Sequence, residues 1–338
     1  MNIEKVAYTR EDVLRRCADM RALYGARRAV LCEGPAAGLR VIEVKTAGRL
    51  RCLLAEDRCL DIVELDYAGI NIGFLSKNGL NAHGGGHVSA GAVDHGAYWI
   101  GGMLSTCGLR NAGPVSQHAG ESHPAHGMIG LAAASQVGIE VSEEAIVITG
   151  VMREAHMFGH AMEMRRRIVI PSDGARIDIR DEVRNLTPEA EPLLLLYHFN
   201  FGFPFLDEGL ELHFSEGTVE GRTPWATERI ADHRVITPPI DGEPEQVFFH
   251  RAAEKEARAR LISRKLGMKA DILYNTEQLP ILSQWKSMRS GDYALGIEPG
   301  TSLLRGRGEE LKNGYDVAAP GYGTRVFEVS LALSEALT

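Results

Sequence analysis

The feature that most constrains the fold is a succession of short apolar segments separated by Gly, Asp, Asn and Pro, which runs from residue 26 to residue 333. In the last of them Phe327, Val329 and Leu331 alternate with polar or small residues. This period of two is that of a strand with one buried face. The strands do not alternate with long helices, which argues against a doubly wound parallel sheet. We therefore expect an all-β, mostly antiparallel chain with more than a third of its residues in strands. Other segments of this kind cover residues 39–46, 50–55, 146–153, 162–170, 175–183 and 193–199.

The N-terminal segment has a helical pattern instead. Apolar residues recur on one face of residues 9–24, as in an amphipathic helix. Thr9 and Asp12 have the spacing of a capping box at its start. No Gly- or Pro-rich linker divides the rest of the chain. We therefore predict a helical extension over residues 1–30 and a single β domain over residues 31–338.

Charge and composition exclude several classes of protein. A net charge of -8 argues against nucleic acid as a partner, because binding to phosphates requires a basic surface, and it argues mildly against anionic membranes. No apolar run is long enough to span a bilayer, and the first residues lack the apolar stretch of a signal peptide. The chain contains no GxGxxG after a strand and no P-loop, so no nucleotide cofactor is expected. Five cysteines without a CxxC pair predict reduced thiols and a cytoplasmic location: Cys17, Cys32, Cys52, Cys59 and Cys107.

Residues 76–134 form a long stretch rich in Gly, His, Asn and Pro, and long ordered loops are usually functional. His83 and His87 form an HxxxH pattern, but the three glycines between them disfavour the helix that would place both rings on one face. No spacing matches a known zinc site, so we expect no bound metal, although a site built from these histidines and Glu121 remains an alternative. The histidines of this stretch are His83, His87, His95, His118, His123 and His126.

His198 is the strongest candidate for a catalytic residue. It follows four consecutive leucines, which predict a buried strand. Alternation along that strand places His198 and Asn200 on one face, with Tyr197 and Phe199 on the other. Burial of polar side chains at the end of an apolar strand costs free energy unless they have hydrogen-bond partners. The alternative is a core histidine that is hydrogen-bonded to the backbone.

Glu298 is the second candidate. It ends an apolar segment, and Pro299 and Gly300 after it predict a turn. A carboxylate in partly apolar surroundings becomes more basic because burial disfavours its charged form. The alternative is a surface glutamate that caps the turn.

Other residues are weaker candidates. His126, between an alanine and a glycine, lies where the polar stretch becomes apolar and could project into a cleft. Arg58 and Asp61 could bind a polar ligand or form a simple ion pair. The three arginines at 165–167 alternate between strand faces and are expected to be solvated. The remaining candidates for substrate binding are Gln284, Trp285 and Lys286.

Five segments, taken in order, resemble the aldose 1-epimerase (galactose mutarotase-like) superfamily, and in particular its bacterial branch known as DUF4432. They span most of the chain, and their ordered set is more specific than any one of them. The segments are DRCLDI at 57–62, GGMLSTCGL at 101–109, HGMIG at 126–130, LLYHFNFGFPFLDEG at 195–209 and QWKSM with LGIEPGTS between 284 and 302.

The resemblance implies a large antiparallel β-sandwich and a sugar-binding catalytic domain over residues 31–338. It also implies that His198 protonates the ring oxygen of the sugar, that Glu298 removes the proton of the anomeric hydroxyl, and that His126 orients the substrate. Such a mutarotation requires no cofactor. Because each group must reach a different oxygen of one ring, we expect His198 and Glu298 on one face, about a sugar width apart.

Two other functions remain open from the sequence. The same scaffold could carry an isomerase, epimerase or lyase that acts on a modified sugar, or a non-catalytic sugar-binding protein. In each case the expected partner is a small-molecule sugar, and a homodimer is an open alternative to a monomer.

Overall fold

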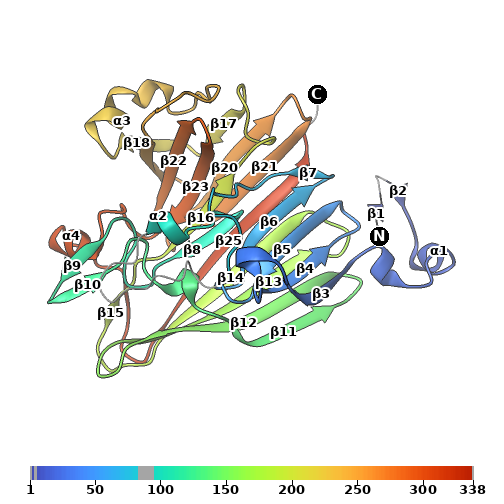
Figure 1. The fold of residues 1–338 in the computed structure, drawn as a ribbon, viewed down its shortest axis with the longest axis horizontal. Helices are drawn as coiled ribbons and strands as arrows, with labels where there is room; N and C mark the ends of the chain where they lie inside the picture. The colour runs from blue at the N-terminus through green and yellow to red at the C-terminus, as the bar shows by residue number, and fades with distance from the viewer. Residues whose placement is uncertain (1, 4–5, 83–94, 337–338) are drawn as a thin grey trace.

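A computed structural model describes residues 2–3, 6–82 and 95–336 of the chain. Strands hold 49% of the residues and helices about 10%, so the prediction of an all-β chain is confirmed. The strands form three large antiparallel sheets that are arranged in layers (Figure 1). The histidines at positions 83 and 87 lie outside the described residues.

The largest sheet has eight strands and carries the long hairpins in the middle of the chain. The predicted segments 146–153, 162–170 and 175–183 are β12, β13 and β14. Strands β12 and β13 extend past both predicted ends because the ladder pairs further residues, whereas β14 starts one residue later than predicted and ends two residues later. In spatial order the sheet contains β11 (Ser135–Val141), β12 (Ala145–Ala155), β13 (Ala161–Pro171), β14 (Arg176–Asn185), β25 (Thr324–Glu335), β21 (Met268–Asn275), β20 (Glu256–Ser263) and β17 (Glu211–Phe214).

Two smaller sheets pack against the eight-stranded sheet. The six-stranded sheet contains β18 (Gly217–Gly221), β19 (Gln246–Ala252), β22 (Ile281–Arg289), β23 (Asp292–Gly300), β16 (Leu196–Phe201) and β8 (Leu104–Cys107). The five-stranded sheet contains β3 (Gly25–Val30), β4 (Arg40–Lys45), β5 (Leu50–Ala55), β6 (Asp61–Tyr67) and β7 (Ile70–Asn71). One continuous apolar core draws residues from all three sheets.

Short elements complete the chain. Two-stranded ladders join β1 (Asn2–Ile3) to β2 (Val6–Ala7), β9 (Ser116–His118) to β10 (Glu121–His123), and β15 (Glu191–Pro192) to β24 (Ala318–Ala319). The α-helices are α1 (Arg10–Leu14), α2 (His95–Tyr98), α3 (Pro224–Glu228) and α4 (Arg307–Lys312). Among the described residues, none of the helices is both long and apolar enough to cross a membrane.

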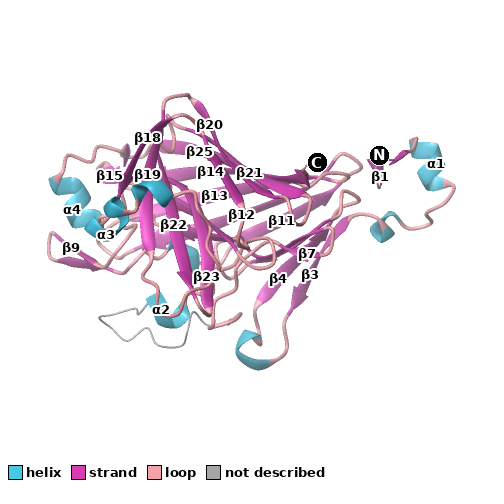
Figure 2. Cartoon of the chain, turned by 90° about the horizontal axis from the view of Figure 1, so that it is seen from above, coloured by secondary structure: helices cyan, strands magenta, loops and turns pink. Residues whose placement is uncertain are grey.

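The N-terminal helix is shorter than predicted. Thr9 and Asp12 do form a capping box, but α1 ends at Leu14 and a separate 3₁₀ turn covers Met20–Ala22. Asp19 caps that turn by accepting a hydrogen bond from the N–H of Arg21 at 2.9 Å, which starts a new element where a single helix was expected. The segment with α1 projects from one end of the molecule (Figure 2). Strand β3 already belongs to the five-stranded sheet, and the division at residue 30 remains a prediction.

Arg166 corrects another expectation from the sequence. Its side chain is completely buried between the sheets, whereas the arginine run was expected to be solvated. It donates two hydrogen bonds to Asp181, at 2.9 and 2.7 Å, and one to Asp61 at 2.9 Å. Thr106 and Tyr197 complete the network through Arg166 and Asp181. Because a buried charge must be paired, these carboxylates explain why an arginine is stable in the core.

Candidate functional site

The register of the six-stranded sheet brings the two strongest candidates together. Phe199 pairs with Ile297 across β16 and β23, so the residues before and after them, His198 and Glu298, are opposite each other. Directly opposite residues in an antiparallel ladder share a face. Tyr197 and Phe199 point the other way, into the core. The predicted common face of His198 and Glu298 is therefore confirmed.

The predicted separation of the pair is wrong. His198 Nε2 lies 3.2 Å from Glu298 Oε1, whereas a gap of about a sugar width was expected. A sugar would not require such a gap, because its ring oxygen and its anomeric oxygen are bonded to the same carbon. Two groups that serve these two oxygens can therefore stand side by side.

The backbone next to Glu298 provides the room for its side chain. A Cβ added at Gly296 would lie 2.1 Å from Glu298 Oε1 and 3.1 Å from the Cβ of Trp285. The carboxyl group therefore leans along β23 over a position where only glycine fits. Ser283, which is opposite Glu298 on β22, lies on the same face.

Aromatic rings surround the pair. The ring centre of His198 is 5.5 Å from Trp99, 5.6 Å from Trp285 and 5.9 Å from His126. Trp99 follows α2, whose first residue, His95, stacks on it at 5.7 Å and lies 4.9 Å from His126. Three histidines and two tryptophans from separate parts of the chain thus form one cluster, which we call the ring cluster.

The backbone places His126 in the ring cluster through a tight connection. His126 has a φ of 56° and Gly127 a φ of 72°. A Cβ on Gly127 would lie 2.2 Å from the carbonyl oxygen of Gly108, so the chain approaches that strand end more closely than any other residue would allow. His126 donates its backbone N–H to Gly113 at 2.9 Å.

Burial sets the protonation of the pair. It lowers the pKa of His198 to about 3, with a smaller contribution from His95. Burial also raises the pKa of Glu298 well above its usual value, and the charge of Glu245 adds to this effect. Burial therefore favours the uncharged form of both groups, a neutral imidazole and a carboxyl group that holds its proton. Desolvation also keeps His126 neutral by lowering its pKa well below the usual range.

Polar atoms without hydrogen-bond partners gather on this face. Among the described residues, buried atoms of this kind include Nδ1 of His198, Nδ1 of His126 and Nε1 of Trp99. Oε1 of Glu298 belongs with them, because its contact with His198 does not have the alignment of a hydrogen bond. Ser283 Oγ on the same face is also without a partner. Unsatisfied buried polar atoms are rare in native proteins, and a cluster of them indicates a place for a polar ligand.

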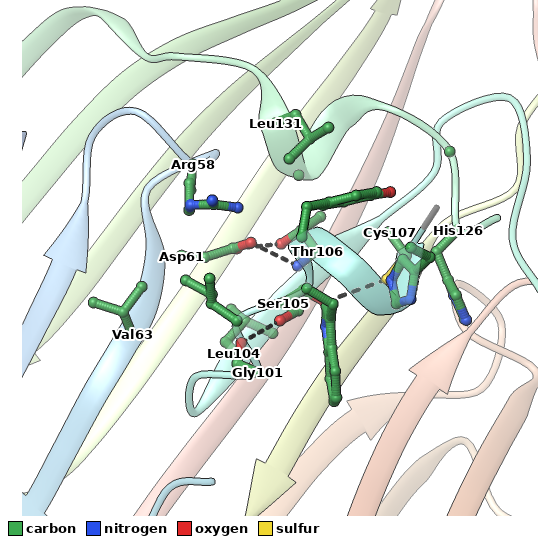
Figure 3. A pocket seen from close by; sticks show the side chains of 16 residues that line it. Arg58, Asp61, Val63, Gly101, Leu104, Ser105, Thr106, Cys107, His126 and Leu131 are labelled. Atoms are coloured by element: carbon green, nitrogen blue, oxygen red, sulfur yellow. Dashed lines mark hydrogen bonds between the residues drawn. The ribbon is translucent and has the colours of Figure 1, made fainter. Parts of the chain in front are cut away.

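A small cavity of about 50 Å³ lies beside the ring cluster (Figure 3). His126 and Cys107 lie on one side of it, and Arg58 and Asp61 lie on the other. Arg58 is buried and donates hydrogen bonds to the backbone and side-chain oxygens of Asn81. Arg58 thus lies next to the site, but its guanidinium group is hydrogen-bonded to Asn81.

The carboxylate of Asp61 is also bound by other groups of the protein. Its carboxylate accepts hydrogen bonds from the N–H of Thr106 at 2.7 Å, from the hydroxyl of Thr106 at 2.5 Å and from Arg166 at 2.9 Å. Burial raises its pKa to about 6 despite these partners. The structure therefore gives Asp61 a place in the buried ionic network at the wall of the cavity.

The other predicted residues divide between the two faces of the sheet. Trp285 and Asn200 share the face of His198, and Trp285 donates its indole N–H to Glu245 at 2.8 Å. Gln284 and Lys286 alternate with Trp285 and lie on the opposite face. They bind the backbone oxygens of residues 233 and 232 at 2.6 and 2.9 Å. The structure does not bring these two side chains to the His198–Glu298 pair.

Sequence reasoning missed Trp99, and it named His95 only as one of the histidines of residues 76–134. Their spacing of four residues in His-Gly-Ala-Tyr-Trp places two rings on one face if the segment is helical, and this signal could have identified them. Over the described parts of the chain, 2–3, 6–82 and 95–336, no three His, Cys, Asp or Glu residues are grouped in a way that could hold a metal ion.

Comparisons with known proteins identify the family and the fold. The model of the family "Domain of unknown function (DUF4432)" matches residues 36–333, and no curated protein matches the chain. A candidate aldose 1-epimerase from Klebsiella pneumoniae has a similar structure, with a TM-score of 0.85 and 20% identity over 93% of this chain and 88% of that protein.

Two further structures are similar at lower identity. A galactose mutarotase-like protein from Clostridium acetobutylicum has a TM-score of 0.67 and 13% identity over 93% of this chain and 99% of its own. A galactose 1-epimerase from Lactobacillus acidophilus has a TM-score of 0.62 and 10% identity over 93% and 100%. At these identities the similarity establishes the fold.

Proposed function

Because the chain belongs to the DUF4432 family and has the galactose mutarotase-like fold, we propose that it is an aldose 1-epimerase-like enzyme that interconverts the anomers of a sugar. The observation that carries this proposal is the contact of 3.2 Å between His198 Nε2 and Glu298 Oε1. An acid and a base in contact can exchange protons with two oxygens on one carbon.

The reaction requires one proton donor and one proton acceptor. In the neutral pair Glu298 holds the proton, so it donates to the ring oxygen while His198 accepts the proton of the anomeric hydroxyl. The bond between the anomeric carbon and the ring oxygen breaks, and an aldehyde forms. Rotation about the C1–C2 bond and closure on the other side reverse both proton transfers. The roles are opposite to those that the family resemblance implies, because burial favours the protonated carboxyl group.

The contact between His198 and Glu298 stabilises the ion pair that forms during ring opening. After both transfers His198 is positive and Glu298 is negative, and their contact offsets part of the desolvation that each charge suffers. The reaction neither takes up nor releases a proton overall. General acid–base catalysis of this kind contributes about 10²–10⁴-fold, and fixed orientation of the sugar adds to it.

The surroundings support a sugar as the ligand. Binding sites for small molecules combine apolar walls with a few convergent polar groups. Trp99 and Trp285 offer ring faces and edges, while Nδ1 of His126 and Oγ of Ser283 offer unsatisfied polar atoms. Hydroxyl groups can donate to and accept from such atoms, and the C–H faces of a sugar can pack on the rings.

The test is NMR exchange spectroscopy of α and β anomers across a panel of reducing sugars. We expect one or more sugars to show enzyme-dependent exchange. Glu298→Gln and His198→Asn should each lower its rate by about 10²–10⁴-fold while folding is retained. The double variant should be little slower than either single one, as for groups that act as a unit.

Glu64→Gln is the matched control, because it makes the same chemical change on β6 of the five-stranded sheet. Its exchange rate should equal that of the wild type. Full activity of Glu298→Gln on the best sugar would refute the role of the pair, and the absence of exchange across the panel would refute mutarotation of these sugars.

A further inference from the structure

A second cavity, of about 380 Å³, opens on the six-stranded sheet. Phe249 and Leu304 form part of its apolar lining and belong to one small apolar cluster. Arg222 and Arg305 line it as well and are exposed. Its volume is in the range of small-molecule sites.

The ladder places this cavity on the same face as the candidate catalytic pair. Phe249 is opposite Ser283 on β22, and Ser283 is opposite Glu298 on β23, so all three side chains share a face. Two strand spacings separate Phe249 from Glu298, which is ~10 Å between backbones. Arg222 follows β18 and binds Val247 through its backbone N–H at 2.9 Å. Its charge acts on both Glu298 and His126.

The charges around the cavity leave the two arginines available. Glu220 forms an ion pair with Arg251 at 2.9 Å. Glu309 accepts a hydrogen bond from Asn313 at 2.9 Å and lies 3.9 Å from Lys312. The backbone N–H of Arg305 donates to Glu310 Oε1 at 3.0 Å. Within residues 2–3, 6–82 and 95–336, no hydrogen-bond or ion-pair partner is found for the guanidinium group of Arg222 or of Arg305. The lining acids are thus engaged and the lining guanidinium groups are not.

An unpaired positive pair is unexpected on this protein. The chain has a net charge of -8, so an anion approaches a generally repulsive surface and finds attraction only where cations are concentrated. Glu245, whose charge acts on Glu298, is already bound by the indole N–H of Trp285. Guanidinium groups bind carboxylate, sulfonate and phosphate oxygens in a bidentate manner.

Building on the proposed function, we infer that the substrate is an anionic sugar whose oxyanion lies between Arg222 and Arg305 while its anomeric carbon lies at His198 and Glu298. The oxyanion is a carboxylate, sulfonate or phosphate on the part of the sugar remote from C1. Arg222 directly follows β18, which is three strand spacings, or ~14 Å, from β23. One hexose and the long side chains at both ends bridge this distance. The arginines bind and select the substrate, and the pair on β16 and β23 carries out the proton transfers.

The experiment compares matched neutral and anionic sugars: galactose with galacturonate, glucose with glucuronate, and glucose with glucose 6-phosphate. Anomer exchange is measured by NMR. We expect kcat/KM of wild-type protein to be higher for an anionic sugar than for its neutral counterpart. Arg222→Gln should raise KM for the anionic sugar about 10- to 100-fold, as for a lost charge-assisted hydrogen bond, and it should affect the reaction of the neutral sugar much less. The uronate and phosphate arms distinguish a carboxylate from a phosphate as the oxyanion.

Arg165→Gln provides the matched control, because it removes the same charge from an exposed side chain on the eight-stranded sheet. It should leave KM unchanged. Equal effects of Arg222→Gln on neutral and anionic sugars would overturn the inference while leaving mutarotation intact.

Binding separates the two proposals if none of the sugars shows exchange. In that case the proposed function fails, and titration calorimetry of galacturonate against galactose decides the inference. Tighter binding of galacturonate that is lost in Arg222→Gln supports the anion site. Equal binding of the two sugars overturns it.

Discussion

Gly296→Ala tests whether the geometry of Glu298 matters as the structure indicates. A methyl group at this position would lie 2.1 Å from Glu298 Oε1, and real Cβ atoms essentially never approach another atom closer than 3.0 Å. The carboxyl group must therefore move by at least 0.9 Å, which changes its contact of 3.2 Å with His198. A misplacement of about 1 Å in a catalytic group lowers the rate by about 10²-fold.

The same substitution has a separate effect on stability. Overpacking a filled interior generally lowers the free energy of unfolding by about 1–3 kcal/mol. Gly150→Ala is the matched control, since its Cβ would meet Leu60 Cδ1 at 2.5 Å in the core, far from the pair along the ladders. Urea unfolding should show a loss for both variants, whereas NMR anomer exchange should fall only for Gly296→Ala. Wild-type exchange in a folded Gly296→Ala protein would refute the argument that the position of the carboxyl group is decisive.

Two further predictions concern buried charges. Burial raises the pKa of Glu298, so the folded state retains a proton that the unfolded state releases above its ordinary pKa of 4.5, and stability from this group is lost as pH rises. The free energy of unfolding of Glu298→Gln should therefore increase relative to that of wild type as the pH rises from 5 to 8, by at most about 1.4 kcal/mol per pH unit. A difference in urea unfolding that does not depend on pH would contradict this. Arg166→Met leaves two buried carboxylates without their cation and should lower the free energy of unfolding by about 3–5 kcal/mol. Arg165→Met changes an exposed residue of the same strand and should change the free energy of unfolding by less than about 0.5 kcal/mol. Similar urea midpoints for the two variants would show that the buried network is not stabilising.

Periodicity predicted the strands well because the alternation of apolar and polar residues within each strand is enough to identify its buried face. Residues 50–55 were predicted and β5 covers Leu50–Ala55, and the alternation in residues 326–333 lies within β25. The prediction of one long helix was wrong because Asp19 caps a separate turn. This local signal outweighed the weak apolar stripe in the segment that follows α1.

The site was only partly within reach of the sequence. The strand positions of His198 and Glu298 follow from local pattern, although the turn predicted at Pro299 and Gly300 is wrong because β23 pairs with β22 through Gly300. The contact of His198 with Glu298 depends on the register between β16 and β23, which no local pattern specifies. The burial of Arg166 likewise depends on Asp61 and Asp181 from other strands. By contrast, period two alone could have separated Gln284 and Lys286 from Trp285, since neighbouring strand residues face opposite ways.

The position of His198 and Glu298 on hydrogen-bonded neighbouring strands has a consequence for heat inactivation. Sites on loops are often lost by local opening below the melting temperature, whereas central strands open only with the whole fold. Strands β16 and β23 lie inside the six-stranded sheet, between β8 and β22. Inactivation and global unfolding should then share one midpoint, and the amide protons of residues 198 and 298 should be among the slowest in the protein to exchange with solvent.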